Sequence, residues 1–260
     1  MSGLGGSSDR DMDDWGAGAV WSGKLFGKGL DYQVFVLNKT TEKFRRSGVL
    51  HPWTSHETAG VKLVPHLNEE WSVPLEAMGQ IGRNGDGDWL SGWSTYSAIR
   101  WDSVRRGWRP FSSLGFHTMS GDKDAADEDG GHHAWDPLWA RGATDSEMFL
   151  YGTHYGQGWW SNILHVKLAA GVNFGYHHRL SGSTGPIWAA AADGMGGGDG
   201  SFKGLLSQVR YDFPILSADK AAGERFEIFG HVVAEFFNPG DYYETEKPAW
   251  FFRWQVEFKF

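Results

Sequence analysis

The last eleven residues, WFFRWQVEFKF at positions 250–260, alternate between apolar and polar side chains almost without interruption. One set comprises Phe252, Trp254, Val256, Phe258 and Phe260, and the other comprises Phe251, Arg253, Gln255, Glu257 and Lys259. Because successive side chains of a strand point to opposite faces, this period of two predicts a strand with one apolar and one mostly charged face.

The same alternation recurs along the chain. Residues 225–236 repeat it, and similar segments lie at about 15–26, 30–43, 56–67, 71–82, 90–101, 108–119, 162–176, 186–194 and 202–215. Many are ten to fourteen residues long, which is enough for a tilted strand to cross the ~25–30 Å of a bilayer's hydrocarbon. The pattern predicts an all-β, antiparallel, up-and-down transmembrane β-barrel domain over residues 1–260, with about eleven to twelve strands.

Aromatic residues mark the ends of many of these segments. The chain has 15 Trp, and the end positions include Trp15, Tyr32, Trp71, Trp89, Trp101, Trp108, Trp160, Trp188, Tyr211 and Trp250. A membrane interface selects aromatic side chains at strand ends. The competing interpretation is a soluble β-sandwich, in which these rings form the core.

Composition removes several classes of protein. With 24 Lys and Arg against 32 Asp and Glu, the chain has a formal charge of −8 and lacks the basic balance typical of a nucleic-acid binder. There is no Cys, which excludes disulfides and thiolate metal sites. No run approaches ~18 consecutive apolar residues, so no transmembrane helix is expected.

Short and long connections alternate, as in outer-membrane barrels with short periplasmic turns and long extracellular loops. The short set is Gly27–Gly29, Asn68–Glu70, Asp102–Gly107, Gly182–Gly185 and Ser217–Glu224. The long set is Arg45–Ser55, Arg83–Asp88, Ser120–Trp159, Met195–Ser201 and Asn238–Ala249. The loop at 120–160 is the longest, and we expect it to form a lid or plug.

Counting strands back from Phe260 places the first strand's start on the extracellular side, which conflicts with the even strand number of such barrels. Two explanations remain open. The chain is the C-terminal part of a larger barrel, which the polar start MSGLGGSSDRDMDD also favours because it lacks a secretory signal. Alternatively, a further strand lies in Glu147–Gln157 and restores a count near twelve.

Three ordered motifs narrow the class further. They are the strand end SLGFHTMSGDKD with Ser120-Gly121-Asp122, the loop element HHAWDPLWARG at 132–142, and the corner FFNPGD at 236–241 before the last strand. Together they resemble the alginate export family of outer-membrane barrels over about residues 70–260. Arg109-Pro110 departs from the family's Pro-Arg order, and Asn238 interrupts its Phe-Phe-Pro-Gly corner.

The resemblance implies an outer-membrane porin-like channel that passes an anionic polysaccharide such as alginate through an Arg- and Lys-lined lumen. It implies no cofactor and no enzymatic step. Partners would be the acidic solute, outer-membrane lipid, lipopolysaccharide and periplasmic export proteins. Independently of the family, Arg binds carboxylates bidentately and stays charged, and a series of weak sites lets a polymer keep moving.

Strand parity identifies the candidate pore-lining residues, because they stand opposite the apolar set of their own strand. These are Lys62, Glu76, Arg100, Arg109, Lys167, Arg210, Arg225 and Arg253. Charged residues inside a barrel also pair with one another, so contact with the solute is a separate question from the face that they occupy.

Metal and catalytic signals are weak. The acidic run Asp122–Gly130 lacks EF-hand spacing, and the pairs His132-His133 and His177-His178 lack zinc-site spacing. No G-x-S-x-G motif is present. We therefore expect neither a metal nor catalytic residues. A general porin or uptake channel for small acidic solutes and, further off, a membrane-embedded hydrolase remain as alternatives.

Overall fold

The computed structural model describes residues 14–27, 29–42, 44–46, 49–51, 53–105, 107–123, 132–136, 146, 161–175, 177–191, 197–219 and 225–259. Its strands are β1 (Asp14–Leu25), β2 (Leu30–Thr41), β3 (Phe44–Arg46), β4 (Val49–His51), β5 (Thr54–Pro65), β6 (Trp71–Ser72), β7 (Leu75–Asn84), β8 (Trp89–Asp102), β9 (Arg109–Met119), β10 (Ile163–Phe174), β11 (His178–Trp188), β12 (Phe202–Asp219), β13 (Arg225–Pro239) and β14 (Ala249–Lys259). No helix in this described part is long and apolar enough to cross a membrane.

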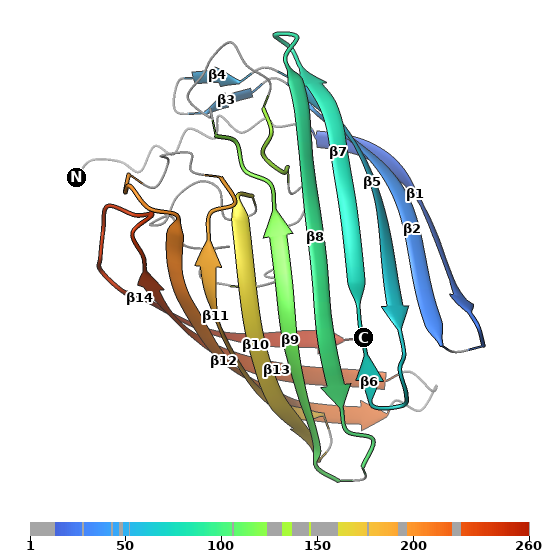
Figure 1. The fold of residues 1–260 in the computed structure, drawn as a ribbon. Helices are drawn as coiled ribbons and strands as arrows, with labels where there is room; N and C mark the ends of the chain where they lie inside the picture. The colour runs from blue at the N-terminus through green and yellow to red at the C-terminus, as the bar shows by residue number, and fades with distance from the viewer. Residues whose placement is uncertain are drawn as a thin grey trace.

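All strands except β3 and β4 belong to one twelve-stranded antiparallel sheet, in which neighbours in space follow chain order (Figure 1). The expected all-β, antiparallel, up-and-down architecture is therefore confirmed. The short strand β6 and the strand β7 pair with the same edge of β8, one after the other. Pro74 lies between β6 and β7, and because proline has no backbone N–H, it interrupts the ladder there. The sheet path thus has eleven strand positions.

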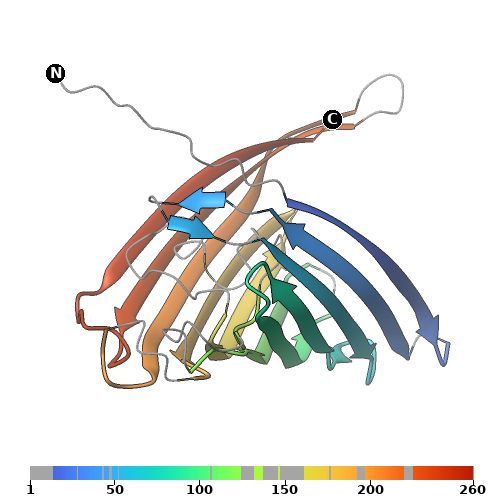
Figure 2. The ribbon, with the colours of Figure 1, turned by 90° about the horizontal axis from the view of Figure 1, so that it is seen from above.

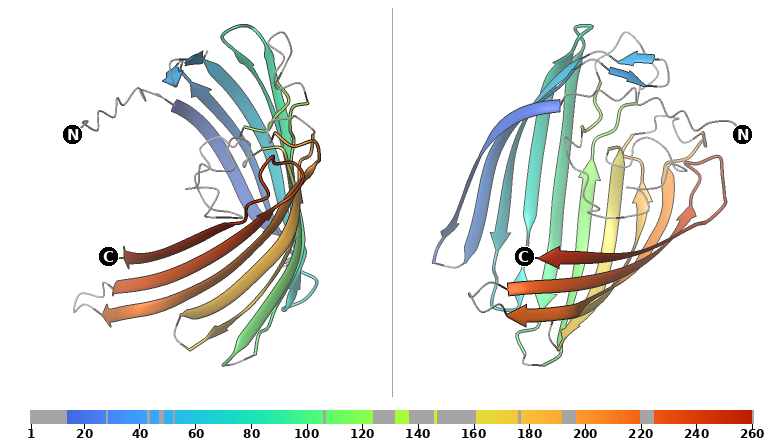
Figure 3. Two further views of the ribbon diagram at one scale, coloured as in Figure 1. Left: turned by 90° about the vertical axis from the view of Figure 1, so that its left-hand side faces the viewer. Right: turned by 180° about the vertical axis from the view of Figure 1, so that it is seen from behind.

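The sheet curls strongly but does not close. Figures 2 and 3 show an open arch with β1 and β14 at its two free edges, and no pairing joins them. Closure into a barrel therefore remains a proposal. The additional strand expected within 147–157 lies outside the described residues.

The connections divide the sheet into two ends. We call the end at which β1 finishes and β2 begins the turn end, and the opposite one, at which β9 finishes and β10 begins, the loop end. Both β1 and β14 start at the loop end and finish at the turn end.

One expected strand and one expected turn were misplaced. The strand expected at 186–194 is β11, His178–Trp188, and the expected turn Gly182–Gly185 lies inside it. The chain reverses instead between β10 and β11, where Gly175 and His177 have positive φ angles of 52° and 58°. Gly185 serves close strand approach instead, because a Cβ there would lie 2.0 Å from the Val166 carbonyl oxygen.

The convex face of the sheet is apolar and exposed. The register places on it the exposed strand residues Trp15, Trp21, Leu25, Val34, Val36, Val61, Trp71, Leu75, Ile81, Trp89, Trp93, Ile99, Leu114, Phe116, Leu168, Leu180, Leu205, Val209, Leu216, Trp250, Phe252, Trp254, Val256 and Phe258. Val20 is the exception among paired strand positions, since it shares the other face with Phe35. An apolar surface of this extent marks a contact with lipid or protein.

The concave face is mostly polar, and its main cluster of buried apolar side chains lies at the loop end. Thr58, Gln80 and Ser94 stand in its register rows and are buried. At the loop end, the buried rings and methyl groups of Trp135, Phe237, Tyr242, Met119, Ile163, Ile187 and Leu206 pack together. The inside of the arch is therefore filled near the loops, while the turn end carries charged side chains.

Candidate functional site

The strand register places all eight candidate residues on the concave face. Lys62 lies on β5, Glu76 on β7, Arg100 on β8, Arg109 on β9, Lys167 on β10, Arg210 on β12, Arg225 on β13 and Arg253 on β14. Arg225 has this position by backbone register only. The eight residues do not form a single cluster, because most of the arginines gather at the turn end of the C-terminal half.

Five arginines lie in three adjacent register rows of the concave face. We call Arg100, Arg109, Arg179, Arg210 and Arg253 the arginine belt. Arg109 pairs with Asn173 of β10, which pairs with Arg179 of β11. Neighbouring strands lie about 4.8 Å apart, so the Cα atoms of Arg109 and Arg179 are about 10 Å apart across the sheet.

Arg210 and Arg253 repeat this spacing. Both pair with Val233 of β13, one from each side, which again leaves two strand spacings between them. Arg210 lies diagonally next to Arg179, because Arg179 pairs with Asp212, two residues further along β12. The belt therefore extends across the sheet from β8 to β14.

Two members of the belt contact neutral groups. The Arg100 guanidinium donates to the Tyr96 hydroxyl at 3.0 Å, and the Arg179 guanidinium lies 4.0 Å from the centre of the Phe111 ring. Among the described residues, neither these two nor Arg109 forms an ion pair. Their positive charges are available to an anion at the concave surface.

The guanidinium groups of Arg210 and Arg253 contact neighbouring polar side chains. Arg210 makes a two-pronged contact with Asp212, at 2.7 Å from Nη2 to Oδ1 and 2.9 Å from Nε, and approaches His231 Nδ1 at 3.5 Å. Arg253 donates to Gln255. The Asp212 contact orients the guanidinium of Arg210 and offsets part of its charge.

The other charged candidates lie outside the belt. Lys62 and Glu76 face each other across β5 and β7, with Nζ and Oε2 3.9 Å apart. Lys167 stands on β10 opposite Gly115 of β9, nearer the loop end. Acidic and basic side chains thus alternate over the concave face rather than leaving it uniformly positive.

Arg179 was missed by sequence reasoning. Its strand was expected eight residues too late, because the glycines at 182 and 185 resemble a turn. The alternation of apolar Leu180 with polar Arg179 and Ser181 was the sequence pattern that indicated a strand at these positions. Arg179 of β11 and Phe111 of β9 occupy the same face on either side of β10, and this relationship depends on register that sequence does not reveal.

The longest loop returns onto the concave face. Residues 132–136, which we call the strap, follow the Ser120-Gly121-Asp122 motif. The Ser120 carbonyl accepts the backbone N–H groups of Trp135 at 3.1 Å and of Asn162 at 2.9 Å. Asp122 accepts the backbone N–H of His133 at 3.2 Å. The motif thus anchors both sides of the loop.

The far end of the strap binds three N-terminal strands. Asp136 accepts from Lys39 Nζ of β2 at 3.3 Å and lies 3.9 Å from His56 Nδ1 of β5. Gln80 of β7 donates to the Asp136 carbonyl at 2.7 Å and accepts its N–H at 2.8 Å. These contacts fix the strap against the inner surface.

A second contact links the same loop to the opposite half of the sheet. The hydroxyl of Ser146 donates to Glu235 Oε2 of β13 at 2.7 Å, and Gln208 of β12 donates to the other carboxylate oxygen. Glu235 and Ser146 are both buried. The loop therefore has anchors on β2, β5 and β7 and also on β13.

Ser, His and Asp side chains meet at the loop end without forming a triad. Ser91 Oγ lies 2.7 Å from His133 Nδ1, but Asp122 contacts the backbone of His133 and the Nδ1 of His132 at 3.4 Å. Among the described residues, none therefore supplies the ring of His133 with the orienting carboxylate of a triad. In the described part of the chain, no three His, Asp or Glu side chains converge as metal ligands.

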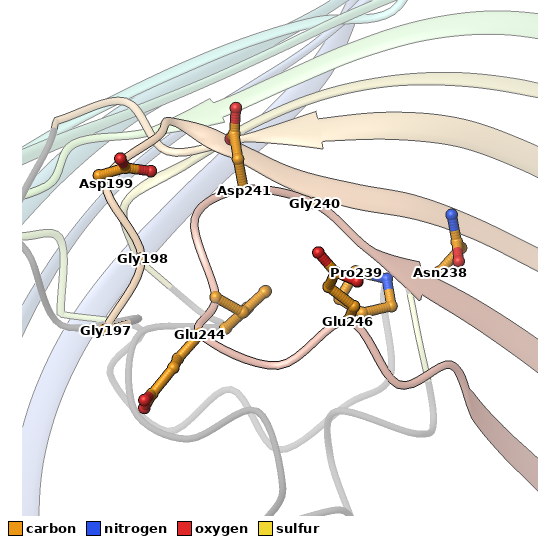
Figure 4. Close-up of a pocket in the computed structure, with 10 residues that line it drawn as sticks. Gly197, Gly198, Asp199, Asn238, Pro239, Gly240, Asp241, Glu244 and Glu246 are labelled. Carbon is orange, nitrogen blue, oxygen red and sulfur yellow. The ribbon is translucent and has the colours of Figure 1, made fainter.

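A cavity of about 820 Å³ opens at the loop end between residues 197–199 and 238–246 (Figure 4). Its wall includes the carboxylates of Asp199, Asp241, Glu244 and Glu246. Asp241 is also structural, because it accepts the backbone N–H of Phe202 at 2.9 Å. A wall of like negative charges does not suit an anionic solute, so the arginine belt is the better candidate site.

Comparison of the sequence with models of known protein families and with curated proteins finds no match.

Proposed function

We propose that this chain forms the wall of an outer-membrane β-barrel channel that passes an acidic solute, with an anionic polysaccharide such as alginate as the leading candidate. The observation that carries the proposal is the arginine belt on the polar concave face of a sheet whose convex face is exposed and apolar. The two faces match a lipid-facing outside and a water-filled inside.

The dimensions of the apolar face support a membrane position. On β8, Trp89 and Trp101 are twelve residues apart, which spans about 30 Å at 3.3 Å per residue and a tilt near 40°. At the turn end, the nearly parallel rings of Trp108 and Phe174, and of Tyr211 and Phe213, each stack at 5.2 Å. Such aromatic groups are typical of bilayer interfaces.

The convex face becomes polar toward the loop end. Asn38 and Glu57 face each other there on β2 and β5, and Arg83 lies above the Trp89 ring at 4.3 Å. In an outer membrane this edge would meet the lipopolysaccharide headgroups, whose anionic groups suit Arg83.

The arginine belt supports an acidic solute. Guanidinium groups bind carboxylates in a planar, two-pronged geometry and do not lose their charge at any physiological pH. A polyuronate presents one carboxylate on each sugar, so several belt arginines can bind one chain at once. Weak binding at several arginines lets the polymer move along the channel rather than be held tightly at one point. Asp212 supports this, because its negative charge interrupts the row of positive charges.

The strap narrows this channel near the loop end, where its Asp136 is bound to the N-terminal strands. The proposal needs neither a catalytic residue nor a cofactor, and export would require periplasmic partners that deliver the polymer. Uptake of small acidic solutes is the second candidate, since the belt does not distinguish a monomer from a polymer. The incomplete Ser91–His133 arrangement gives a hydrolase no support.

Bilayer recordings of protein extracted from outer membranes test the proposal. Replacing Arg109, Arg179 and Arg253 by Ala should move the reversal potential toward cation selectivity, and polyuronate should no longer block the current. Arg83→Ala, which removes a convex arginine, is the matched control and should change neither property. Unchanged selectivity in the triple variant would remove the belt from the pathway, while block by small uronates alone would favour the uptake channel.

A further inference from the structure

We propose that Lys39 of β2 and His56 of β5 form a second carboxylate-binding site, which a carboxylate of the solute enters by displacing Asp136 of the strap. The inference rests on the proposed function for the acidic nature of the solute, and it adds a site that this solute opens for itself. The site lies on β2 and β5, whereas the arginine belt begins at β8.

The buried charge of Lys39 requires an anion. Its side chain is 9% exposed, and the register places it opposite His56 on the concave face. A buried ammonium group loses its hydration, so lysine is almost never fully buried unless it is paired. Asp136 supplies such an anion, because its Oδ1 lies 3.3 Å from Lys39 Nζ. A carboxylate of the solute is the chemical equivalent that can replace it.

Asp136 fits this site imperfectly. Charge-assisted N–H···O bonds are usually about 2.7–2.9 Å long, whereas its carboxylate oxygens lie 3.3 Å from Lys39 Nζ and 3.9 Å from His56 Nδ1. This Nδ1 atom is buried and forms no hydrogen bond among the described residues. Two hydrogen bonds to Gln80 fix the backbone of Asp136 and limit how far its side chain can reach. An untethered carboxylate has no such restraint and can approach both nitrogen atoms.

The site can be reached from water on the side of the strap. The Asp136 side chain is 25% exposed, against 9% for each of the side chains of Lys39 and His56. A solute therefore meets the strap carboxylate before it meets the two buried nitrogen atoms. Exchange of one carboxylate for another leaves the number of buried charges unchanged, so no charge is left unpaired during the replacement.

The exchange loosens the strap where it crosses the concave face. Asp136 joins the strap to β2 through its side chain, and without this contact Gln80 holds only backbone atoms on β7. The strap also sits directly on β8, since a Cβ at Gly92 would lie 2.9 Å from Trp135 Cα. No solute fits between the strap and β8 at this point. Release of Asp136 therefore allows the strap to lift when an acidic solute arrives.

Glucuronate binding in detergent micelles tests the site. All variants carry Arg109→Ala, Arg179→Ala and Arg253→Ala, so that these belt arginines make no contribution. Asp136→Asn removes the competing carboxylate. The double variant Lys39→Gln with Asp136→Asn differs from it only in the lysine charge. It should retain its fold, because removing both partners leaves no buried charge unpaired.

We expect Asp136→Asn to bind glucuronate about tenfold more tightly than the chain that keeps Asp136, because no internal carboxylate occupies the site. The double variant should lose this gain, and glucose, which has no carboxylate, should not bind at the site. Equal glucuronate affinity in Asp136→Asn and in the double variant would overturn the proposal. An affinity that Asp136→Asn does not raise would overturn it as well.

The reaction of maleimide with a cysteine introduced at Ala134 follows the strap itself, since the chain has no Cys of its own. In the chain that keeps Asp136, glucuronate should accelerate this reaction up to a plateau, and sodium chloride at the same ionic strength should not. Equal acceleration by both salts would mean that screening of the ion pair releases the strap, and the proposal would fail. Failure here leaves the proposed channel intact, because that function is judged from reversal potentials of the belt variants.

Discussion

Lys39 and Asp136 are separated by 97 positions in the chain, yet the lysine Nζ lies 3.3 Å from the aspartate Oδ1. The side chain of Lys39 is 9% exposed and that of Asp136 is 25% exposed, so this ion pair is shielded from water on one side. It attaches the strap to β2, and the two hydrogen bonds of Gln80 to the Asp136 backbone align it on β7.

Replacing Asp136 by Asn should release the strap. Lys39 loses its carboxylate partner, while Gln80 keeps its contacts to the backbone, so we expect a loss of about 1–2 kcal/mol in strap attachment after allowance for partial exposure. Reaction of a cysteine introduced at Ala134 with maleimide should become roughly tenfold faster. Asp86→Asn, at the tip of the β7–β8 hairpin, is the matched control. If the cysteine reacted at the same rate in the parent chain, in Asp136→Asn and in Asp86→Asn, the ion pair would not hold the strap.

Arg179 should contribute to anion binding through its shape as well as its charge. Lys at this position keeps the charge but loses the planar group that lies over Phe111 at 4.0 Å. We expect Arg179→Lys to weaken polyuronate binding several-fold in detergent micelles, with Phe111→Leu giving part of the same loss. If Arg179→Lys binds as tightly as the parent chain, the ring contact has no part in recognition.

The sequence and the structure agree where the information is local. The alternation of apolar and polar side chains in 250–260 is a property of a single strand, and it correctly located β14 and its two faces. Parity placed residues such as Arg100 and Arg210 opposite the apolar set for the same reason. The turn-like glycines at 182 and 185 misplaced β11, because a glycine required by a close strand looks the same as one required by a turn.

Long-range relationships were beyond sequence reasoning. That Arg109 and Arg179 share a register row depends on how β9, β10 and β11 align, which no single strand encodes. The attachment of Asp136 to β2 and β7 likewise requires a loop to return across the sheet. Motif analysis found the Ser120-Gly121-Asp122 element, but its role as the anchor of that loop emerges only from its hydrogen bonds.

Ser120 provides a test of this anchor. Its hydroxyl accepts the backbone N–H of Trp93 at 3.0 Å, and the residue is buried, so Ser120→Ala leaves that N–H without its partner. We expect a loss of about 1–2 kcal/mol in the free energy of unfolding, measured by denaturant titration in micelles. Ser112→Ala, on the convex face of β9, should cost much less. Equal effects of the two variants would refute a special role for Ser120.

The close approach of β10 to β11 predicts a larger effect at Gly185. A Cβ at this position would lie 2.0 Å from the Val166 carbonyl oxygen and 2.9 Å from His165 Nε2, and backbone cannot move aside as a flexible side chain can. Gly185→Ala should therefore destabilise the sheet by about 1–3 kcal/mol, within the range for overpacking. Gly79→Ala on β7 is the control, because a Cβ there meets nothing within 4 Å. If a turn occupied 182–185 instead, the alanine at 185 would face solvent, and the two variants would unfold at the same denaturant concentration.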